Sequence, residues 1–171
     1  TGLALDGAHA RADCAACHGP PPPPVAGPLP STRSFGWVAE RRPQIVRRIH
    51  DQGHEVACHG FSHQLVYDQS PEVFREETLR SKGLLEEIIG TSVDGYRAAS
   101  YSITARSLWA LDILFEAGFE YDSSIFPVRH DRYGIPDAPE LPHRLTTPRG
   151  EELIEFPLST AHVLGARLPV A

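Results

Sequence analysis

Several kinds of sequence feature are missing from this chain of 171 residues, and each absence excludes a class of protein. No stretch approaches the ~18 uninterrupted apolar residues of a membrane-spanning helix, and no charged start followed by an apolar core marks an export signal. Sixteen Lys and Arg stand against 22 Asp and Glu, which gives a formal net charge of -6, and no basic run could follow a phosphate backbone. We therefore expect no membrane span and no nucleic-acid partner.

Methionine is absent and the chain begins at Thr1, which predicts a processed chain, a fragment or a fusion rather than a complete translation product. The cysteines number three, Cys14, Cys17 and Cys58, and are too few and too unevenly spaced for a disulfide framework. The compartment is therefore left open. What is present is typical of a folded protein of about one domain, because 41% of the residues are hydrophobic and 22% are charged.

Composition changes near residue 35 and divides the chain into an irregular leader, 1–35, and a folded domain, 36–171. Seven of the 16 prolines lie in the leader's segment GPPPPPVAGPLP, which favours polyproline II structure and is typical of a linker. Before it, Cys14-Ala-Ala-Cys17-His18 fits the pattern of covalent c-type haem attachment and resembles a segment of multihaem cytochromes. Nineteen residues followed by polyproline are too short to enclose a haem, so we expect none and keep a haem electron-transfer segment as an alternative.

Downstream of the linker, helical and strand patterns alternate. Capping residues and apolar spacing predict helices over 43–53, 70–90 and 104–118, each ending at a glycine. Ser70 and Thr104 are the expected N-caps of the last two, and Val73 and Phe74 belong to the expected buried face. Strands are predicted over 54–59, 94–97 and 119–122, with two more around a Pro-Arg-Gly turn in 144–156. Alternation with short joints implies βαβ units, so we predict an α/β fold with a mainly parallel sheet, open or closed into a barrel.

Polar residues that could carry chemistry follow the predicted strands. His59 and His63, four residues apart, would lie on one side of a helical turn, where two neutral imidazoles could share a divalent cation. Arg97 could hold a carboxylate or polarise a carbonyl, and Asp122 could orient a catalytic imidazole. The alternatives are an accidental pair among nine histidines, a solvated arginine and a turn cap. The ends of parallel strands are where barrels and open sheets build their sites, which favours the functional interpretation.

Four phrases in a fixed order carry a family resemblance: GWVAERRPQIVRRI, GHEVACHGFSHQLVYDQ, GYRAASYSIT and YDSSIFPVRHDRYGIPDAP. From residue 36 to the end, the chain resembles the polysaccharide deacetylases of carbohydrate esterase family 4, and the phrases look like the bacterial subgroup associated with exopolysaccharide and exosortase loci. The resemblance implies a distorted (β/α) barrel and metal-dependent hydrolysis of N-acetyl groups on a polysaccharide or oligosaccharide. By position, His59 and His63 match the family's metal-binding pair, usually for zinc. Arg97 matches the arginine that steadies the catalytic carboxylate, and Asp122 matches the fourth-motif aspartate.

The chain also departs from the family pattern. The pair of aspartates that supplies the catalytic base and the third metal ligand is missing before residue 43, where Asp6 is only a distant candidate. The histidine motif that supplies the acid is missing at the end, and His162 matches it by residue type alone. Ala99 stands where the family has proline. We therefore expect a partial barrel without its first and last units, low metal affinity and little or no catalysis by this chain alone.

Two other functions are open beside that of a polysaccharide deacetylase. One is electron transfer by the haem motif, which a Soret band would reveal. The other is a carbohydrate-binding remnant that keeps the groove without the base, and it would bind chitin-type oligomers without releasing acetate. Within the hydrolases, amidases of small ureides and amides share the implied fold, while the subgroup phrases favour a bacterial polysaccharide rich in N-acetylhexosamine.

Overall fold

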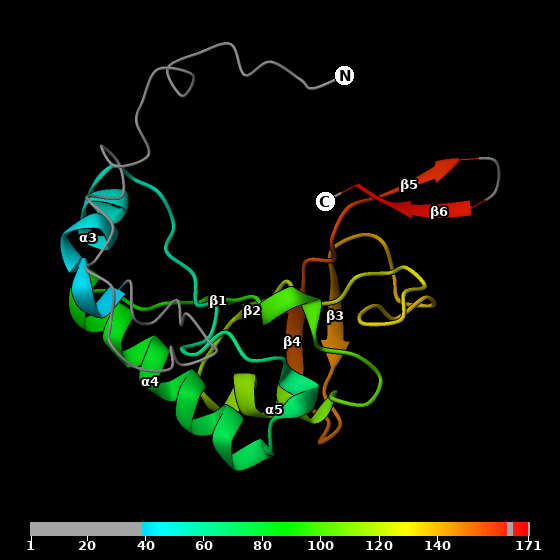
Figure 1. Cartoon of the computed structure of the whole chain (residues 1–171), viewed down its shortest axis with the longest axis horizontal. Coiled ribbons are helices and arrows are strands. Elements are labelled where there is room, and N and C mark those ends of the chain that lie inside the picture. The colour runs from blue at the N-terminus through cyan, green and yellow to red at the C-terminus, as the bar shows by residue number, and fades with distance from the viewer. Residues whose placement is uncertain (1–38, 164–165, 171) are drawn as a thin grey trace, which may run out of the picture. The chain divides into compact units, whose positions relative to one another are not determined.

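The computed structural model of the chain describes residues 39–163 and 166–170 (Figure 1). The predictions for Asp6, for Cys14, Cys17 and His18, and for the polyproline linker therefore lie outside the described residues. Among the residues that are described, no helix is both long and apolar enough to cross a bilayer.

Helices and strands alternate along the described part of the chain, as the sequence predicts. The helical elements are α3 (Pro43–Asp51), the 3₁₀ turn η2 (Val66–Asp68), α4 (Pro71–Ile89), the 3₁₀ turn η3 (Ala99–Tyr101) and α5 (Trp109–Glu116). The strands are β1 (Gly95–Tyr96), β2 (Tyr121–Asp122), β3 (His143–Thr146), β4 (Glu152–Glu155), β5 (Thr160–Val163) and β6 (Ala166–Pro169).

The main sheet has the strand order β1-β2-β4-β3 (Figure 1). β1 pairs with β2 and β2 pairs with β4 in parallel, whereas β3 runs antiparallel to β4. β5 and β6 form a separate antiparallel hairpin. The mainly parallel sheet and the two strands around the Pro-Arg-Gly turn are confirmed, while the hairpin has no counterpart among the predicted strands.

The ends of α4 follow from three residues of its sequence. The Ser70 hydroxyl accepts a hydrogen bond from the Val73 N–H at 3.3 Å, and Pro71 occupies the first turn, where no N–H is needed. Gly90 ends the helix with a φ of 78°, in the left-handed region that favours glycine. Both predicted ends are confirmed. The predicted buried face is wrong at one position, because Val73 is 44% exposed whereas Phe74 is 1% exposed.

The strand predicted over 54–59 is wrong in extent. It is reduced to one parallel bridge, in which the Cys58 N–H donates to the Gly95 carbonyl at 2.8 Å and the Arg97 N–H donates to the Cys58 carbonyl at 2.9 Å. The physical reason is the short partner: β1 offers two residues for pairing, so the alternating pattern of 54–59 cannot be continued into a ladder.

The third helix begins later than predicted. Thr104 is not its N-cap; instead the Thr104 N–H donates to the Ser107 hydroxyl at 2.9 Å, which closes a separate turn before the helix. α5 then starts at Trp109 without a side-chain cap, and its end at Gly118, with a φ of 75°, is as expected. A polar residue that satisfies its neighbours locally competes with helix formation, which accounts for the difference.

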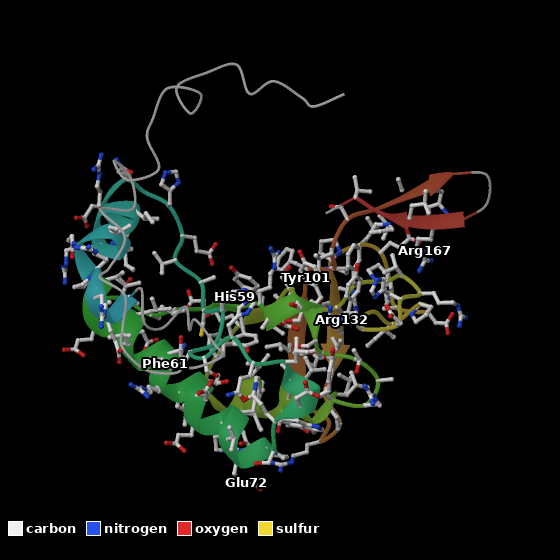
Figure 2. The ribbon with its side chains drawn as sticks, in the orientation of Figure 1. His59, Phe61, Glu72, Tyr101, Arg132 and Arg167 are labelled. Atoms are coloured by element: carbon white, nitrogen blue, oxygen red, sulfur yellow. The ribbon has the colours of Figure 1, made fainter. Side chains whose placement is uncertain are left out.

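The β5–β6 hairpin is held to the loop after β2 by a cluster around Glu140. This carboxylate accepts hydrogen bonds from the Thr160 hydroxyl at 2.9 Å and from His162 Nε2 at 2.9 Å, and it forms an ion pair with Arg167 at 2.6 Å. Arg167, labelled in Figure 2, also donates to two main-chain carbonyls of that loop. The hydrogen bond from His162 lowers the pKa of the Glu140 carboxyl. His162, which matches the family's acid by residue type alone, therefore contacts Glu140.

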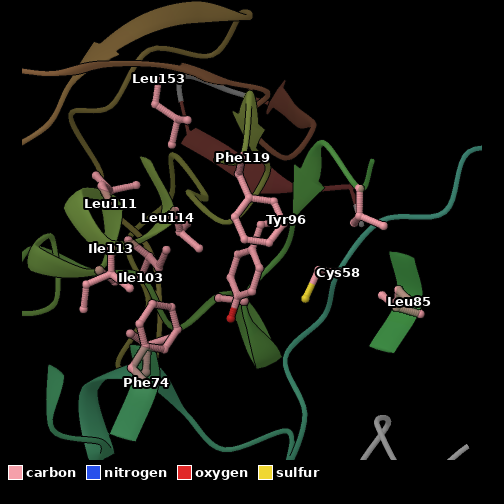
Figure 3. Close-up of a cluster of buried hydrophobic side chains, with 14 of the residues drawn as sticks. Cys58, Phe74, Leu85, Tyr96, Ile103, Leu111, Ile113, Leu114, Phe119 and Leu153 are labelled. Atoms are coloured by element: carbon pink, nitrogen blue, oxygen red, sulfur yellow. The ribbon is translucent and has the colours of Figure 1, made fainter. Parts of the chain in front are cut away.

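An aromatic cluster forms the centre of the hydrophobic core (Figure 3). Phe74 of α4 meets the Tyr96 ring edge-on, with centroids 5.9 Å apart, and meets Trp109 in the same way at 5.6 Å. Tyr96 in turn packs against Phe119 at 5.5 Å. Edge-to-face contacts add to the free energy gained by burying the rings. The cluster fixes β1 relative to α4 and α5, and so fixes the strand ends that carry the predicted site.

Candidate functional site

The two predicted ligands His59 and His63 lie side by side on a loop between the Cys58 bridge and η2. Their ring centroids are 5.0 Å apart, and the ring planes are inclined by 63°. The helical turn expected from their spacing is wrong. Gly60, with a φ of 76°, and His63, with a φ of 56°, take left-handed conformations that bend the loop and bring the rings together.

One nitrogen of His59 is fixed by the main chain of the next strand end. His59 Nδ1 lies 2.7 Å from the Arg97 carbonyl oxygen, and because a carbonyl can only accept, Nδ1 carries the proton in this hydrogen bond. In the neutral ring, Nε2 then holds the lone pair that a metal ion would bind. Burial lowers the pKa of His59, and the hydrogen bond to Arg97 opposes this in part, so the neutral ring is favoured.

Glu77, which the sequence analysis did not single out, holds the histidine loop to α4. Its carboxylate accepts hydrogen bonds from the Ser62 N–H at 3.0 Å and from the Ser62 hydroxyl. His59, His63 and Glu77 line one small cavity. No sequence pattern links residues 62 and 77, since only the fold brings the loop onto this helix.

Replacing Glu77 by alanine should loosen the histidine loop. Two partly buried donors of Ser62 would lose their acceptor, at a cost of about 1–3 kcal/mol in the free energy of unfolding. Urea denaturation measures that loss, and hydrogen exchange of the Ser62 amide shows whether the loop opens. Glu76→Ala, an exposed position next to it on the same helix, is the matched control and should cost within about 0.5 kcal/mol. Equal losses in the two variants would contradict the role of Glu77.

The Arg97 guanidinium is anchored on the loop after β2. Its Nε donates to the Ser123 carbonyl at 3.0 Å, and another of its nitrogens donates to the Ser123 hydroxyl at 2.7 Å. The Ser123 hydroxyl donates in turn to the Phe156 carbonyl at 2.7 Å. Arg97 therefore links three strand ends through its side chain and orients His59 through its main chain.

Asp122 lies at the end of β2, and its carboxyl group is completely buried. The Ser124 hydroxyl donates to Asp122 Oδ1 at 2.5 Å, and the same hydroxyl accepts from the Ala98 N–H at 2.8 Å. Burial raises the pKa of Asp122, and the hydrogen bond from Ser124 opposes the rise. The structure thus brings His59, His63 and the Arg97 main chain together, while the Asp122 carboxyl joins them through Ser124 and the strand end at Ala98.

Comparison with known proteins assigns the chain to a family. Residues 34–121 match the family model of the polysaccharide deacetylases, and residues 123–171 match a Domain of unknown function (DUF3473). The chain belongs to the polysaccharide deacetylase family. The boundary between the two matched segments falls inside one sheet, since β2 ends at Asp122 and pairs in parallel with β4 of the second segment.

Related proteins agree with this assignment. A peptidoglycan deacetylase of Helicobacter pylori is 31% identical over 98 residues, which make up 57% of this chain and 32% of that protein. A crystal structure from Mycobacterium smegmatis, assigned to the polysaccharide deacetylases, has a TM-score of 0.59 at 30% identity and covers 72% of this chain and 38% of its own. A crystal structure from Pseudomonas aeruginosa PAO1, similarly assigned, has a TM-score of 0.53 at 22% identity. The match covers 72% of this chain and 37% of that protein.

The chain therefore spans about a third of the length of these relatives. The predicted α/β fold of the deacetylase (β/α) barrel type is confirmed. The assignment to the exopolysaccharide subgroup and the resemblance of the leader to a cytochrome segment stay predictions.

Deacetylases of this family generally depend on a divalent metal ion. The histidine pair fits such an ion in donor type, because it offers two imidazoles with close rings, one of them oriented by a main-chain carbonyl. Within 39–163 and 166–170, no group of three or more His, Cys, Asp and Glu side chains is arranged to hold a metal. A catalytic zinc site uses roughly three protein ligands, and the histidine pair offers two imidazoles.

Proposed function

We propose that this chain takes part in the metal-dependent removal of N-acetyl groups from a bacterial polysaccharide. In this proposal His59 and His63 are ligands of a divalent cation, and zinc is the expected ion. Family membership supports the reaction type. The observation that carries the site is the contact between the two imidazole rings, whose centroids are 5.0 Å apart, together with the hydrogen bond from His59 Nδ1 to the Arg97 carbonyl.

Each proposed residue has a definite task. His59 and His63 hold the cation through neutral nitrogens, and Glu77 keeps their loop in place through Ser62. When bound, a divalent cation polarises the acetamide carbonyl and lowers the pKa of water. The family resemblance implies that Arg97 and Asp122 are catalytic residues, and we assign each of them a positioning role as well. Arg97 orients His59, and Asp122 fixes the strand end beside it.

The substrate class proposed is an N-acetylated polysaccharide or oligosaccharide. A second candidate is carbohydrate binding without hydrolysis, which is favoured by the finding that the described residues contain no complete set of metal ligands. Acetate release from chitin-type oligomers by the full chain distinguishes the two, since binding without acetate release selects the second. We also propose residues 1–35 as a separate leader and 36–171 as the deacetylase domain, a division supported by the start of the family match at residue 34.

The double substitution of His59 and His63 by alanine tests the metal site. The wild-type chain should take up zinc, and the double variant should lose that uptake, because both nitrogen donors are gone. Elemental analysis of dialysed protein and calorimetric titration with zinc measure the effect. His54→Ala, at an exposed histidine outside the pair, is the control and should leave zinc uptake unchanged. A double variant that binds as much zinc as the wild type would remove the site.

A further inference from the structure

Four ionisable side chains form a row across the main sheet. In the pairing register, Cys58 is opposite Tyr96, Tyr96 is opposite Asp122, and Asp122 is opposite Glu155. Partners in adjacent parallel strands point to the same side of a sheet, so all four share one face. Each of them is buried, with an exposed fraction of 3% or less. Two carboxyl groups are therefore neighbours in the interior.

Each of the two carboxyl groups has one oxygen with a clear donor. Asp122 Oδ1 accepts from the Ser124 hydroxyl at 2.5 Å, and Glu155 Oε1 accepts from the Ile125 N–H at 3.0 Å. The other oxygens, Asp122 Oδ2 and Glu155 Oε2, are buried and receive no N–H or O–H from any other described residue. Because Asp122 and Glu155 are opposite each other on paired strands, their side chains are neighbours on this face of the sheet. Two carboxylates cannot bond to each other without a proton between them.

The groups around the pair favour one negative charge over two. On the shared face, burial raises the pKa of the Cys58 thiol and of the Tyr96 hydroxyl, so both are neutral. His143, the register partner of Glu155 on β3, lies near the pair but uses Nδ1 to donate to the Leu141 carbonyl at 2.9 Å. The Arg97 guanidinium, bound to Ser123 after β2, is the cation whose charge acts on Glu155. Two buried anions beside this guanidinium would still be strongly unfavourable.

We propose that Asp122 and Glu155 form one acid–carboxylate unit that holds a single proton, and that Glu155 is a positioning residue for the histidine site. Glu155 keeps the proton and donates it in a hydrogen bond to Asp122. Asp122 is thereby fixed as the acceptor for Ser124, whose hydroxyl accepts from the Ala98 N–H at 2.8 Å.

The unit reaches the site through one strand end. Ala98 follows Arg97, and the Arg97 carbonyl accepts the hydrogen bond that orients His59. Loss of Glu155 would leave Asp122 charged and without its partner, and the strand end that depends on Ser124 would shift. The claim that Glu155 supports the metal site rests on the proposed function. The claim about where the proton and the hydrogen bonds lie does not.

The shared proton is tested directly by carbon-13 NMR of the full chain with labelled Asp and Glu carboxyl groups. Glu155, assigned by its absence from the spectrum of Glu155→Gln, should show the chemical shift of a protonated carboxyl at pH 7. A Glu155 signal that titrates near the ordinary glutamate value of about 4.3 would overturn the proposal.

The positioning role is tested with two variants and one control. Glu155→Ala removes the hydrogen bond to Asp122, so nitrogen-15 shifts of His59 should lose the signature of a proton fixed on Nδ1, and zinc affinity should fall about 10- to 100-fold. Glu155→Gln keeps an N–H donor without needing the proton, so it should preserve both the nitrogen-15 shifts of His59 and the zinc affinity. Leu153→Ala, at a position 2% exposed on the same strand, destabilises the protein but should leave the His59 tautomer unchanged.

Two outcomes would contradict the positioning role: an unchanged His59 signal in Glu155→Ala, or the same change in Leu153→Ala. The NMR readouts need neither metal nor substrate. The two claims can be separated when no variant binds zinc but substitution of residue 155 still changes the His59 tautomer. In that case the proposed function fails, and the positioning role of Glu155 stands.

Discussion

Replacing Phe74 by alanine should remove a large share of the stability of the molecule. The Phe74 side chain is 1% exposed and lies between Tyr96 and Trp109, at centroid distances of 5.9 and 5.6 Å. Cutting back a buried phenylalanine costs about 3–5 kcal/mol, because the lost burial adds to the cost of the cavity. Domains are typically stable by about 5–15 kcal/mol, so a large share would be gone.

Urea denaturation followed by tryptophan fluorescence is a suitable measurement, because Trp109 packs against the substituted ring. Phe115→Ala is the matched control, since Phe115 lies on α5 and is 38% exposed. The control should cost much less, as its burial is partial. If the two variants lose equal stability, the aromatic cluster is not the centre of the core.

The second large effect expected is a fall in stability as the pH rises from about 4 toward neutrality. Burial, followed by the charge of Asp122, raises the pKa of Glu155 far above the ordinary carboxyl range, and burial also raises that of Asp122. In the unfolded chain these groups titrate near about 4.3 and 3.9. Above those values the folded state holds protons that the unfolded state has released. Each such proton lowers the free energy of unfolding by up to about 1.4 kcal/mol per pH unit.

The stabilising contribution is therefore fully present below about pH 4 and is lost as the pH rises through the folded-state values. His59, whose pKa is lowered by burial, acts in the opposite sense at acid pH, so the comparison must be between variants. The variant Glu155→Gln has no proton to hold at this position. The difference between its free energy of unfolding and that of the wild type should therefore grow from pH 4 to pH 8. Denaturation at several pH values measures the difference. A difference that does not change with pH would contradict the prediction.

Much of the fold could be predicted because its signals are local. Ser70, Pro71 and Gly90 set the ends of α4 through the conformations that these residue types prefer, and the structure has those ends. The alternation of helix and strand likewise required a mainly parallel sheet. Local signals were misleading at Thr104, because the Ser107 N–H donates to the Thr104 carbonyl and not to the hydroxyl that would cap a helix.

The sequence indicates the residues of the candidate site but not how they are connected. The spacing of His59 and His63 pointed to a pair, yet a loop with left-handed residues brings the rings together where a helical turn was expected. Glu77 and Glu155 could not be found from the sequence, because the sequence around a glutamate on a helix or strand does not show which side chains it will contact. Pairing of β2 with β4 places Glu155 beside Asp122, and that contact depends on tertiary structure alone. The hairpin of β5 and β6 was missed because its strands are four residues each, too short for a clear alternation.

The double attachment of the histidine loop limits how far the pair could be transplanted. Five residues, 59–63, do not hold their own shape, since Glu77 ties Ser62 to α4 and Arg97 fixes the His59 ring. An engineer who grafts the pair onto another scaffold would have to carry over one helix turn and one strand end with it. Inherited variation meets the same constraint, because a substitution of Glu77 on that turn of α4 would release Ser62 and with it the histidine loop.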